Sequence, residues 1–105
     1  MHYRETVVWR KAMEAAREVY GMRSQITRAV VSIPANVAEG WTRESDKEKA
    51  QFLAIAQGSL AETETLLTLC EDLTWFPRAE TQALRGLLEE VSRMLTTMRR
   101  NRRRP

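Results

Sequence analysis

The residue types that most often carry catalysis are scarce in this chain. Its one histidine is His2. A di-iron helical bundle needs Glu-x-x-His pairs and a zinc site needs clustered histidines and cysteines, so neither can be assembled. Glu14 and Glu18, like Glu44 and Glu48, are four residues apart, which is typical of solvated helix faces. No acid has another at i+3, the spacing with which helical nucleotide pyrophosphohydrolases hold magnesium. Because glycine-rich phosphate loops and Ser/His/Asp sets are also missing, we predict no enzymatic activity, no metal and no cofactor.

The single cysteine, Cys70, excludes an internal disulfide. It lies on an apolar stripe of a predicted helix, where a thiol is more often a small core residue than a nucleophile. We therefore predict that Cys70 is buried and unreactive.

Positive charge is concentrated near residue 100. Residues 99–104 read RRNRRR and hold five of the 17 basic residues without an acid, which leaves 12 basic and 14 acidic residues elsewhere. Each guanidinium can replace a counterion on a phosphate, so the segment predicts binding to RNA or DNA that weakens with salt and reads little sequence. The alternative is a solubilising terminus. The candidate nucleic-acid-binding residues are Arg99, Arg100, Arg102, Arg103 and Arg104.

A second candidate region surrounds Pro34, where an apolar stripe at helical spacing continues through the proline. Pro34 removes the hydrogen bond to the carbonyl of Val30, at a typical cost of about 3 kcal/mol. We predict that neighbouring polar residues satisfy this carbonyl and fix the register of a helix pair or a subunit interface. The alternatives are simple solvation, or a ligand site or ring pore lined by Glu39. This structural polar row comprises Gln25, Arg28, Ser32, Asn36, Glu39 and Glu62.

Four helical segments would position these residues. Apolar periodicity predicts helices at 6–20, 22–42, 45–73 and 77–100, with Ser45 and Glu48 as a capping box and Pro77 in a first turn. Short connections without strand patterns predict an all-α, antiparallel up-and-down four-helix bundle over residues 1–98, followed by a basic, disordered tail at 99–105. Only Tyr20 and Gly21 separate the first two helices, at the lower limit for such connections.

The predicted turn near residues 43–46 sets the register of the helices on either side of it. Antiparallel packing about this turn places Arg28 opposite Glu62, for which we predict a partly buried ion pair. It also places Ser32 opposite Gly58, where the missing side chain would let the two backbones approach closely.

The composition is that of one folded, helix-rich domain, with 43% hydrophobic and 30% charged residues but only three prolines. No run approaches the roughly 18 apolar residues of a membrane span, and no signal-peptide apolar region follows residues 4–5, so we predict no membrane association and a cytoplasmic location. A domain of this size has a high surface-to-volume ratio, which favours a homo-oligomer.

Two blocks of the sequence, SQITRAVVSIPANVAEG (24–40) and FLAIAQGSLAETETLL (52–67), resemble the bacterial four-helix-bundle family of 23S rRNA intervening-sequence proteins. The resemblance extends from Val8 to about Leu73. It implies the fold of the accessory variability proteins of diversity-generating retroelements, a closed homopentameric ring, and nucleic acid or a reverse transcriptase as partner. The chain departs from the family between Val19 and Gly21, where relatives have a longer first helix and a polar loop. Either a deletion or residues missing from this sequence would account for the difference.

Taken together, these patterns predict a non-enzymatic, homo-oligomeric four-helix bundle, with a ring favoured by the resemblance. It would bind RNA, DNA or a nucleoprotein partner with little sequence specificity. The alternative function is a protein-binding adaptor or scaffold without nucleic-acid contact.

Overall fold

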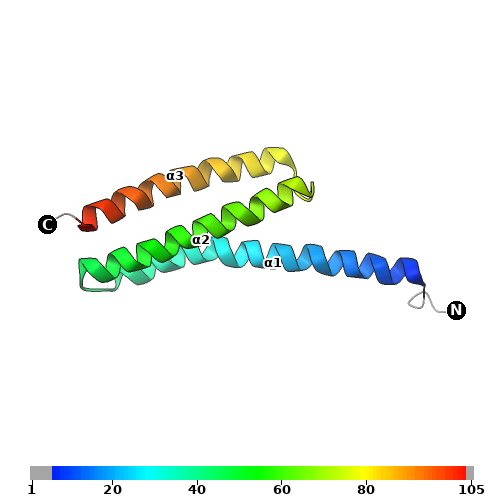
Figure 1. The fold of residues 1–105 in the computed structure, drawn as a ribbon, viewed down its shortest axis with the longest axis horizontal. Coiled ribbons are helices and arrows are strands. Elements are labelled where there is room, and N and C mark those ends of the chain that lie inside the picture. Colours follow the sequence, from blue (N-terminus) through cyan, green and yellow to red (C-terminus); the bar gives the residue numbers. More distant parts are fainter. Residues whose placement is uncertain (1–5, 104–105) are drawn as a thin grey trace.

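Three long helices make up the part of the chain that the structure describes. The computed structural model describes residues 6–103, apart from the side chains at positions 15, 16, 18–20 and 103. Helix α1 spans Val7–Trp41, α2 spans Asp46–Asp72 and α3 spans Arg78–Arg103, and this range contains no strand (Figure 1). The predicted all-α class is thereby confirmed, while the closed bundle and the oligomeric ring stay predictions.

All four expected segments are helical, but the first two run together through Tyr20 and Gly21 into the single helix α1. The expected break between residues 20 and 22 was therefore wrong. A glycine inside a helix costs only about 1 kcal/mol relative to alanine, whereas reversing the chain there would require a connection at the lower limit of length. Helix α1 also continues through Pro34 to Trp41, where the chain turns into α2.

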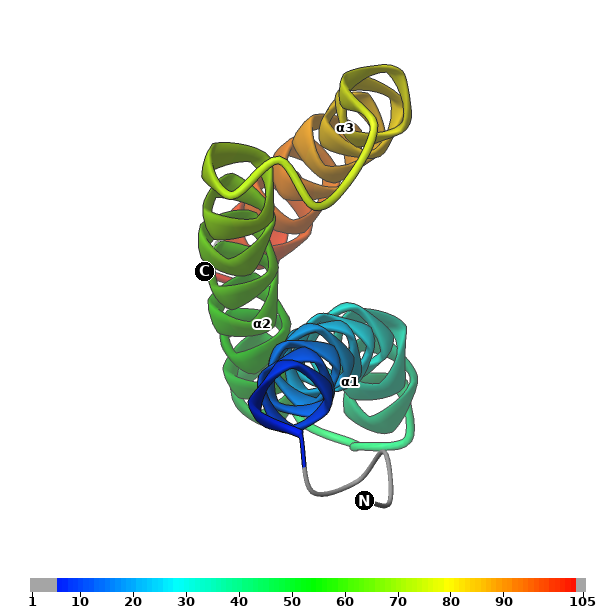
Figure 2. The ribbon, with the colours of Figure 1, turned by 90° about the vertical axis from the view of Figure 1, so that its right-hand side faces the viewer.

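Helix α2 lies between the other two helices and packs against both, while the backbones of α1 and α3 do not approach each other within the described range (Figure 2). All three helices contribute to the core, and α2 contributes most of it because both its sides are covered. Cys70 is fully buried there, as predicted. The buried apolar residues are Ile26, Ala29, Ile33, Leu53, Ala56, Leu60, Leu67, Cys70, Leu88 and Leu95.

The turn between α1 and α2 is fixed by a cap and a close approach. The side-chain oxygen of Ser45 accepts a hydrogen bond from the amide of Glu48 at 3.1 Å, as the capping box predicts. A Cβ added to Gly40 would lie 2.9 Å from the Cβ of Phe52, so the helices meet closely at Gly40. The expected close approach at Gly58 was wrong: this glycine is exposed, and a Cβ there would meet nothing within 4 Å. Ser32 lies against Ser59 instead.

The first part of α1 extends beyond the ends of α2 and α3 (Figure 1). We call residues Val7–Tyr20 the arm. Its first turn is capped by Thr6, whose side chain accepts a hydrogen bond from the amide of Trp9 at 3.2 Å. The first buried side chain described along α1 is that of Ile26, so the core begins only after the arm. The molecule is accordingly elongated, with extents of 72 × 27 × 14 Å.

Among residues 6–103, none of the helices combines the length and the apolar character that crossing a membrane requires.

Candidate nucleic-acid interface

The arginine-rich segment is the last part of α3, which continues to Arg103. The prediction of a disordered tail from residue 99 was wrong, because two of its arginines are held against the helical body. Arg99 donates a short hydrogen bond to the side-chain oxygen of Gln57. Arg102 lies 3.7 Å from a carboxylate oxygen of Asp46, and its guanidinium carbon is 5.1 Å from the ring centroid of Trp41. The side chain of Arg103 and all of Arg104 lie outside the described residues.

The turn between α1 and α2 brings further cations to the same end of the molecule. Arg43 forms an ion pair with Glu39 at 2.6 Å, and its guanidinium lies 4.9 Å from the ring centroid of Phe52. The Lys49 ammonium donates to the carbonyl oxygens of Trp41 at 3.2 Å and Arg43 at 2.6 Å. The basic residues grouped here, which we call the basic end, are Arg43, Lys47, Lys49, Arg99, Arg100 and Arg102.

Trp41 is the aromatic centre of the basic end. Its ring lies 5.3 Å from the Lys49 ammonium and 5.1 Å from the Arg102 guanidinium, so it accepts cation–π contacts from two different helices. These contacts tie the end of α3 to the end of α1 without a direct approach of their backbones. Residue spacing alone did not predict this role for Trp41. The turn contains both acidic and basic residues, so its sequence does not indicate a cluster of cations around Trp41.

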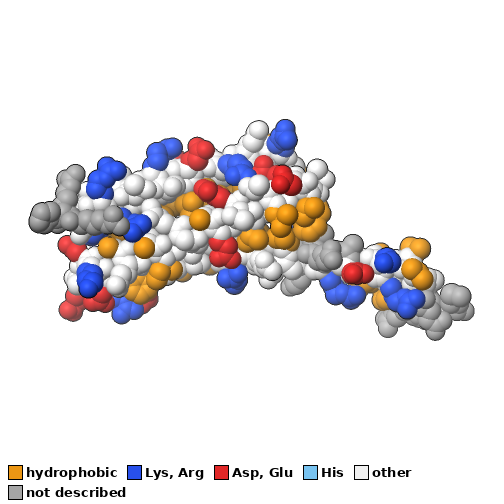
Figure 3. Space-filling view, viewed as in Figure 1, with side chains coloured by type: hydrophobic (Ala, Val, Ile, Leu, Met, Phe, Trp, Pro, Cys, Tyr) orange, Lys and Arg blue, Asp and Glu red, His pale blue; other side chains and the backbone are white. Residues whose placement is uncertain are grey.

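Two cations of the basic end form neither an ion pair nor a hydrogen bond to the described part of the chain. Lys47 and Arg100 are exposed and form no hydrogen bond to the described residues. Lys47, Arg99 and Arg102 line a shallow cavity of about 400 Å³, and Arg99 and Arg100 line a second one of about 410 Å³. Figure 3 shows Lys and Arg side chains at this end, interspersed with acidic ones.

The chemistry of this end suits a phosphate backbone. The Nε atoms of Arg43, Arg99 and Arg102 are enclosed and have no hydrogen-bond partner, while the terminal nitrogens of these guanidinium groups contact Glu39, Gln57 and Asp46. Guanidinium groups held in place can donate in pairs to phosphate oxygens, and an ammonium group acts as a point charge. The acids Glu39 and Asp46 offset part of the charge, so the exposed groups of Lys47 and Arg100 are the principal free cations.

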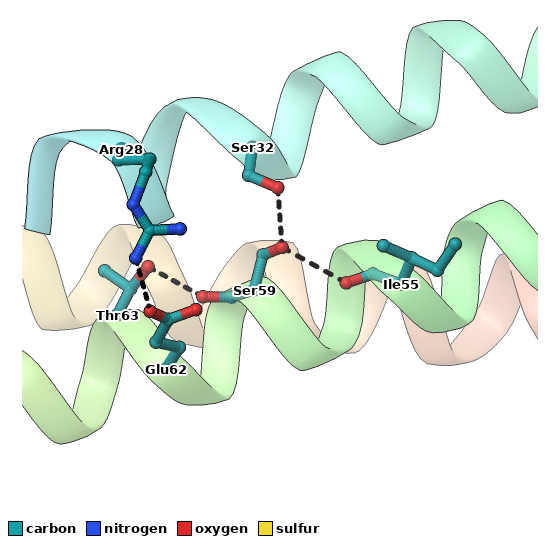
Figure 4. Close-up of polar contacts among 6 residues, drawn as sticks. All are labelled: Arg28, Ser32, Ile55, Ser59, Glu62 and Thr63. Atoms are coloured by element: carbon teal, nitrogen blue, oxygen red, sulfur yellow. Dashed lines mark hydrogen bonds and ion pairs between the residues drawn. The ribbon is translucent and has the colours of Figure 1, made fainter. Parts of the chain in front are cut away.

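Three members of the polar row, Arg28, Ser32 and Glu62, lie along the contact between α1 and α2 (Figure 4). The hydroxyl oxygens of Ser32 and Ser59 are 2.7 Å apart, which links the two helices. The Asn36 amide donates to the carbonyl oxygen of Ser32 at 2.8 Å and to its hydroxyl at 3.0 Å. We expected the polar row to satisfy the carbonyl of Val30, which Pro34 leaves without its helical hydrogen bond. Asn36 donates to Ser32 instead.

The charged members of the polar row lie at its exposed edge. Arg28 and Glu62 form the expected ion pair at 3.1 Å, but their side chains are 68% and 46% exposed, so the expectation of a partly buried pair was wrong. Glu39 pairs with Arg43 and is likewise exposed. Gln25 is exposed and forms no hydrogen bond to the described residues. The row therefore joins two helices, while the alternative of a ligand site or ring pore lined by Glu39 stays a prediction.

The two buried hydroxyls of α2 and one polar contact between α2 and α3 were not predicted from the sequence. Ser59 and Thr63 are buried on α2, and Thr63 donates to the carbonyl of Ser59 at 2.8 Å. Arg85 of α3 donates to Glu71 at 2.7 Å and to Thr68 at 2.8 Å. The spacings of these α2 residues, four positions between Ser59 and Thr63 and three between Thr68 and Glu71, can be read from the sequence. The sequence does not show that a Ser or Thr hydroxyl bonds to a carbonyl of its own helix, which lets the side chain be buried like an apolar one.

The groups that could catalyse or bind a metal are dispersed. No three His, Cys, Asp or Glu side chains come close enough to hold a metal ion within residues 6–103. Burial raises the pKa of the Cys70 thiol above its ordinary value, which disfavours the reactive thiolate.

Comparison with known proteins gives one positive result. The sequence model of the 23S rRNA-intervening sequence protein family matches residues 4–97, which include most of all three helices. The comparison with curated proteins gives no match.

Proposed function

The chain belongs to the 23S rRNA-intervening sequence protein family, and we propose that it is a non-enzymatic homo-oligomer that binds the backbone of RNA or DNA through its basic end. The observation that carries this proposal is the gathering of cations from α2, α3 and the turn between α1 and α2 around Trp41. Arg43, Lys49 and Arg102 reach this region from different parts of the sequence. The positive charge is thus presented by a folded surface.

Binding would proceed by charge neutralisation. Lys47 and Arg100 would contact phosphates directly because they form no ion pair in the described part of the chain. Arg99 and Arg102 line the adjoining cavity and would add charge from fixed positions. Trp41 and Phe52 already stack with cations, and these contacts would compete with base stacking. The binding would consequently tolerate most sequences.

Self-association would multiply these contacts. A closed ring of five copies, which the family resemblance implies, would display each arginine of the basic end five times. Linked weak contacts gain affinity because the later ones form at a high effective concentration. We place such an assembly in the cytoplasm, with a nucleic acid or a nucleoprotein such as a reverse transcriptase as its partner.

The test is a salt titration of the full chain with a single-stranded RNA and a duplex DNA, followed by fluorescence anisotropy. We expect the double variant Lys47→Gln, Arg100→Gln to bind more weakly. On duplex DNA, the slope of log affinity against log salt should become shallower by about 0.9 for each phosphate that the variant no longer neutralises. Arg78→Gln is the matched control, because Arg78 is an exposed arginine at the opposite end of α3.

Two outcomes would contradict the proposal. Equal slopes for the double variant and the wild type would show that the basic end does not contact phosphate. No binding at low salt by the wild type would favour the adaptor function, in which a protein partner contacts the helical body.

A further inference from the structure

An apolar groove runs between α1 and α3, where their backbones stay apart. It has a volume of about 580 Å³ and is lined almost entirely by aliphatic side chains. Leu87, which is 59% exposed, lies on its α3 side, and Pro34 lies on its α1 side. The groove lining comprises Val30, Ile33, Pro34, Val37, Ala38, Leu84, Leu87, Leu88 and Val91.

The arm carries a matching apolar surface. Val7 is 61% exposed and Val8 is 80% exposed, and Ala12, one turn after Val8, is exposed as well. Figure 3 shows hydrophobic side chains on the projecting end of α1, next to cations. A helix with an uncovered apolar row and a groove that lacks a helix are complementary features of one chain.

The arm cannot reach the groove of its own chain. Helix α1 is continuous through Tyr20 and Gly21, so the arm points away from the residues that line the groove (Figure 1). A reversal of direction would need a connection of about 2–8 residues between two helices, and the chain has none there. A connection too short to fold back directs a helix to a neighbouring copy, which is the usual origin of domain swapping.

We propose that the arm of one copy occupies the groove between α1 and α3 of a second copy. In the smallest closed arrangement, two α1 helices cross in opposite directions near Gly21 and each inserts its arm into the other subunit. Such an exchange is symmetric, since both copies give an arm and receive one.

The lengths of the two features agree. At 1.5 Å per residue, Val7 lies about 21 Å from Gly21 along α1, and the groove residues Val30 to Ala38 lie about 14 to 26 Å from Gly21 on the other side. An arm that crosses at Gly21 therefore brings Val7, Val8 and Ala12 level with the groove of the other copy.

The charges are also complementary. In sequence, the arm carries three cations, Arg10, Lys11 and Arg17, against the two acids Glu14 and Glu18. Glu90 follows the groove residue Leu87 by three positions on α3, which makes the two neighbours on the helix surface, and it is an exposed acid without an ion-pair partner in the described range. A cation of the incoming arm would find an acid at the rim.

The oligomer is measured by size-exclusion chromatography with light scattering on the full chain over a range of concentrations. We expect the wild type to have a multiple of the chain mass. Val8→Asp in the arm and Leu87→Asp in the groove should each raise the dissociation constant at least about a hundredfold, because each buries an unpaired carboxylate. Ile55→Asp, at an exposed residue of α2, controls for an apolar surface outside the groove.

A mixing experiment distinguishes arm exchange from any other interface. The Val8→Asp chain keeps an intact groove and the Leu87→Asp chain keeps an intact arm, so an equimolar mixture should recover a complex of two chains that neither variant forms alone. A Gly/Ser insertion of about six residues between Tyr20 and Gly21 should instead give a folded monomer, because each arm can then reach its own groove.

The inference is overturned if the wild type is a monomer at all concentrations or if the mixture recovers nothing. It is also overturned if Ile55→Asp dissociates the oligomer while Val8→Asp and Leu87→Asp do not. Such an oligomer would assemble through the outer face of α2, and the proposed nucleic-acid binding would be unaffected.

Discussion

Two glycines on facing helices provide a sharp test of the packing between α1 and α2. Both lie inside helices, so replacing either with alanine gains helix propensity, at most about 1 kcal/mol. At Gly58 the new methyl group meets open space, and the gain should be realised. At Gly40 the new Cβ would lie 2.9 Å from the Cβ of Phe52, which is fixed to its backbone and cannot rotate away.

The expected magnitudes follow from this contrast. Overpacking in a tight contact costs about 1 to 3 kcal/mol, so Gly40→Ala should lower the free energy of unfolding by about 0 to 2 kcal/mol after the propensity gain. Gly58→Ala should raise it by up to about 1 kcal/mol. The difference between the two variants is therefore the informative quantity.

Urea denaturation, followed by circular dichroism at one fixed protein concentration, measures both variants against the wild type. The m-values should stay equal, so that a shift in midpoint reports stability alone. Equal stabilisation of the two variants would refute the close approach at Gly40 and with it the packing of the hairpin end.

Other expectations concern the core, the surface pair and the thiol. Leu53→Ala should lower the free energy of unfolding by about 2 to 5 kcal/mol in a urea titration, because Leu53 is fully buried, whereas Leu69→Ala should change it far less, because Leu69 is 42% exposed. Glu62→Gln should change it by less than about 1 kcal/mol at neutral pH, and a larger decrease would show that the ion pair with Arg28 is buried in the assembly. Cys70 should react with a thiol reagent only after unfolding. Its folded pKa is raised, so the unfolded thiol loses its proton first and stability should fall as pH rises above the ordinary thiol pKa.

Residue spacing was enough to predict the hairpin of α1 and α2, and it failed where packing between distant segments decides the outcome. The turn at residues 43–46 fixes the register, so the pairing of Arg28 with Glu62 followed from counting along two helices. The exposure of that pair did not follow, since it depends on which face α3 covers. Counting also could not distinguish a helix that ends at Tyr20 from one that continues through Gly21.

In the candidate site, too, the sequence predicted local features but not the contacts between distant segments. The arginines of residues 99–102 were identified from charge alone. Their helical state depends on contacts with Gln57, Asp46 and Trp41, which are distant from them in the sequence. Long-range stacking of this kind leaves no periodic pattern, so the joint role of Trp41, Lys49 and Arg102 became visible only in three dimensions.

The way α1 ends has a consequence for the order of folding. Its last turn contains no basic residue, although the free carbonyls there form the negative pole of the helix dipole. Lys49, which belongs to α2, donates to two carbonyls at this end, those of Trp41 and Arg43. The positive charge at the C-terminal end of α1 is thus supplied by Lys49 of α2. A peptide that stops at Arg43 should fray at its end, and the hairpin should form as one cooperative unit.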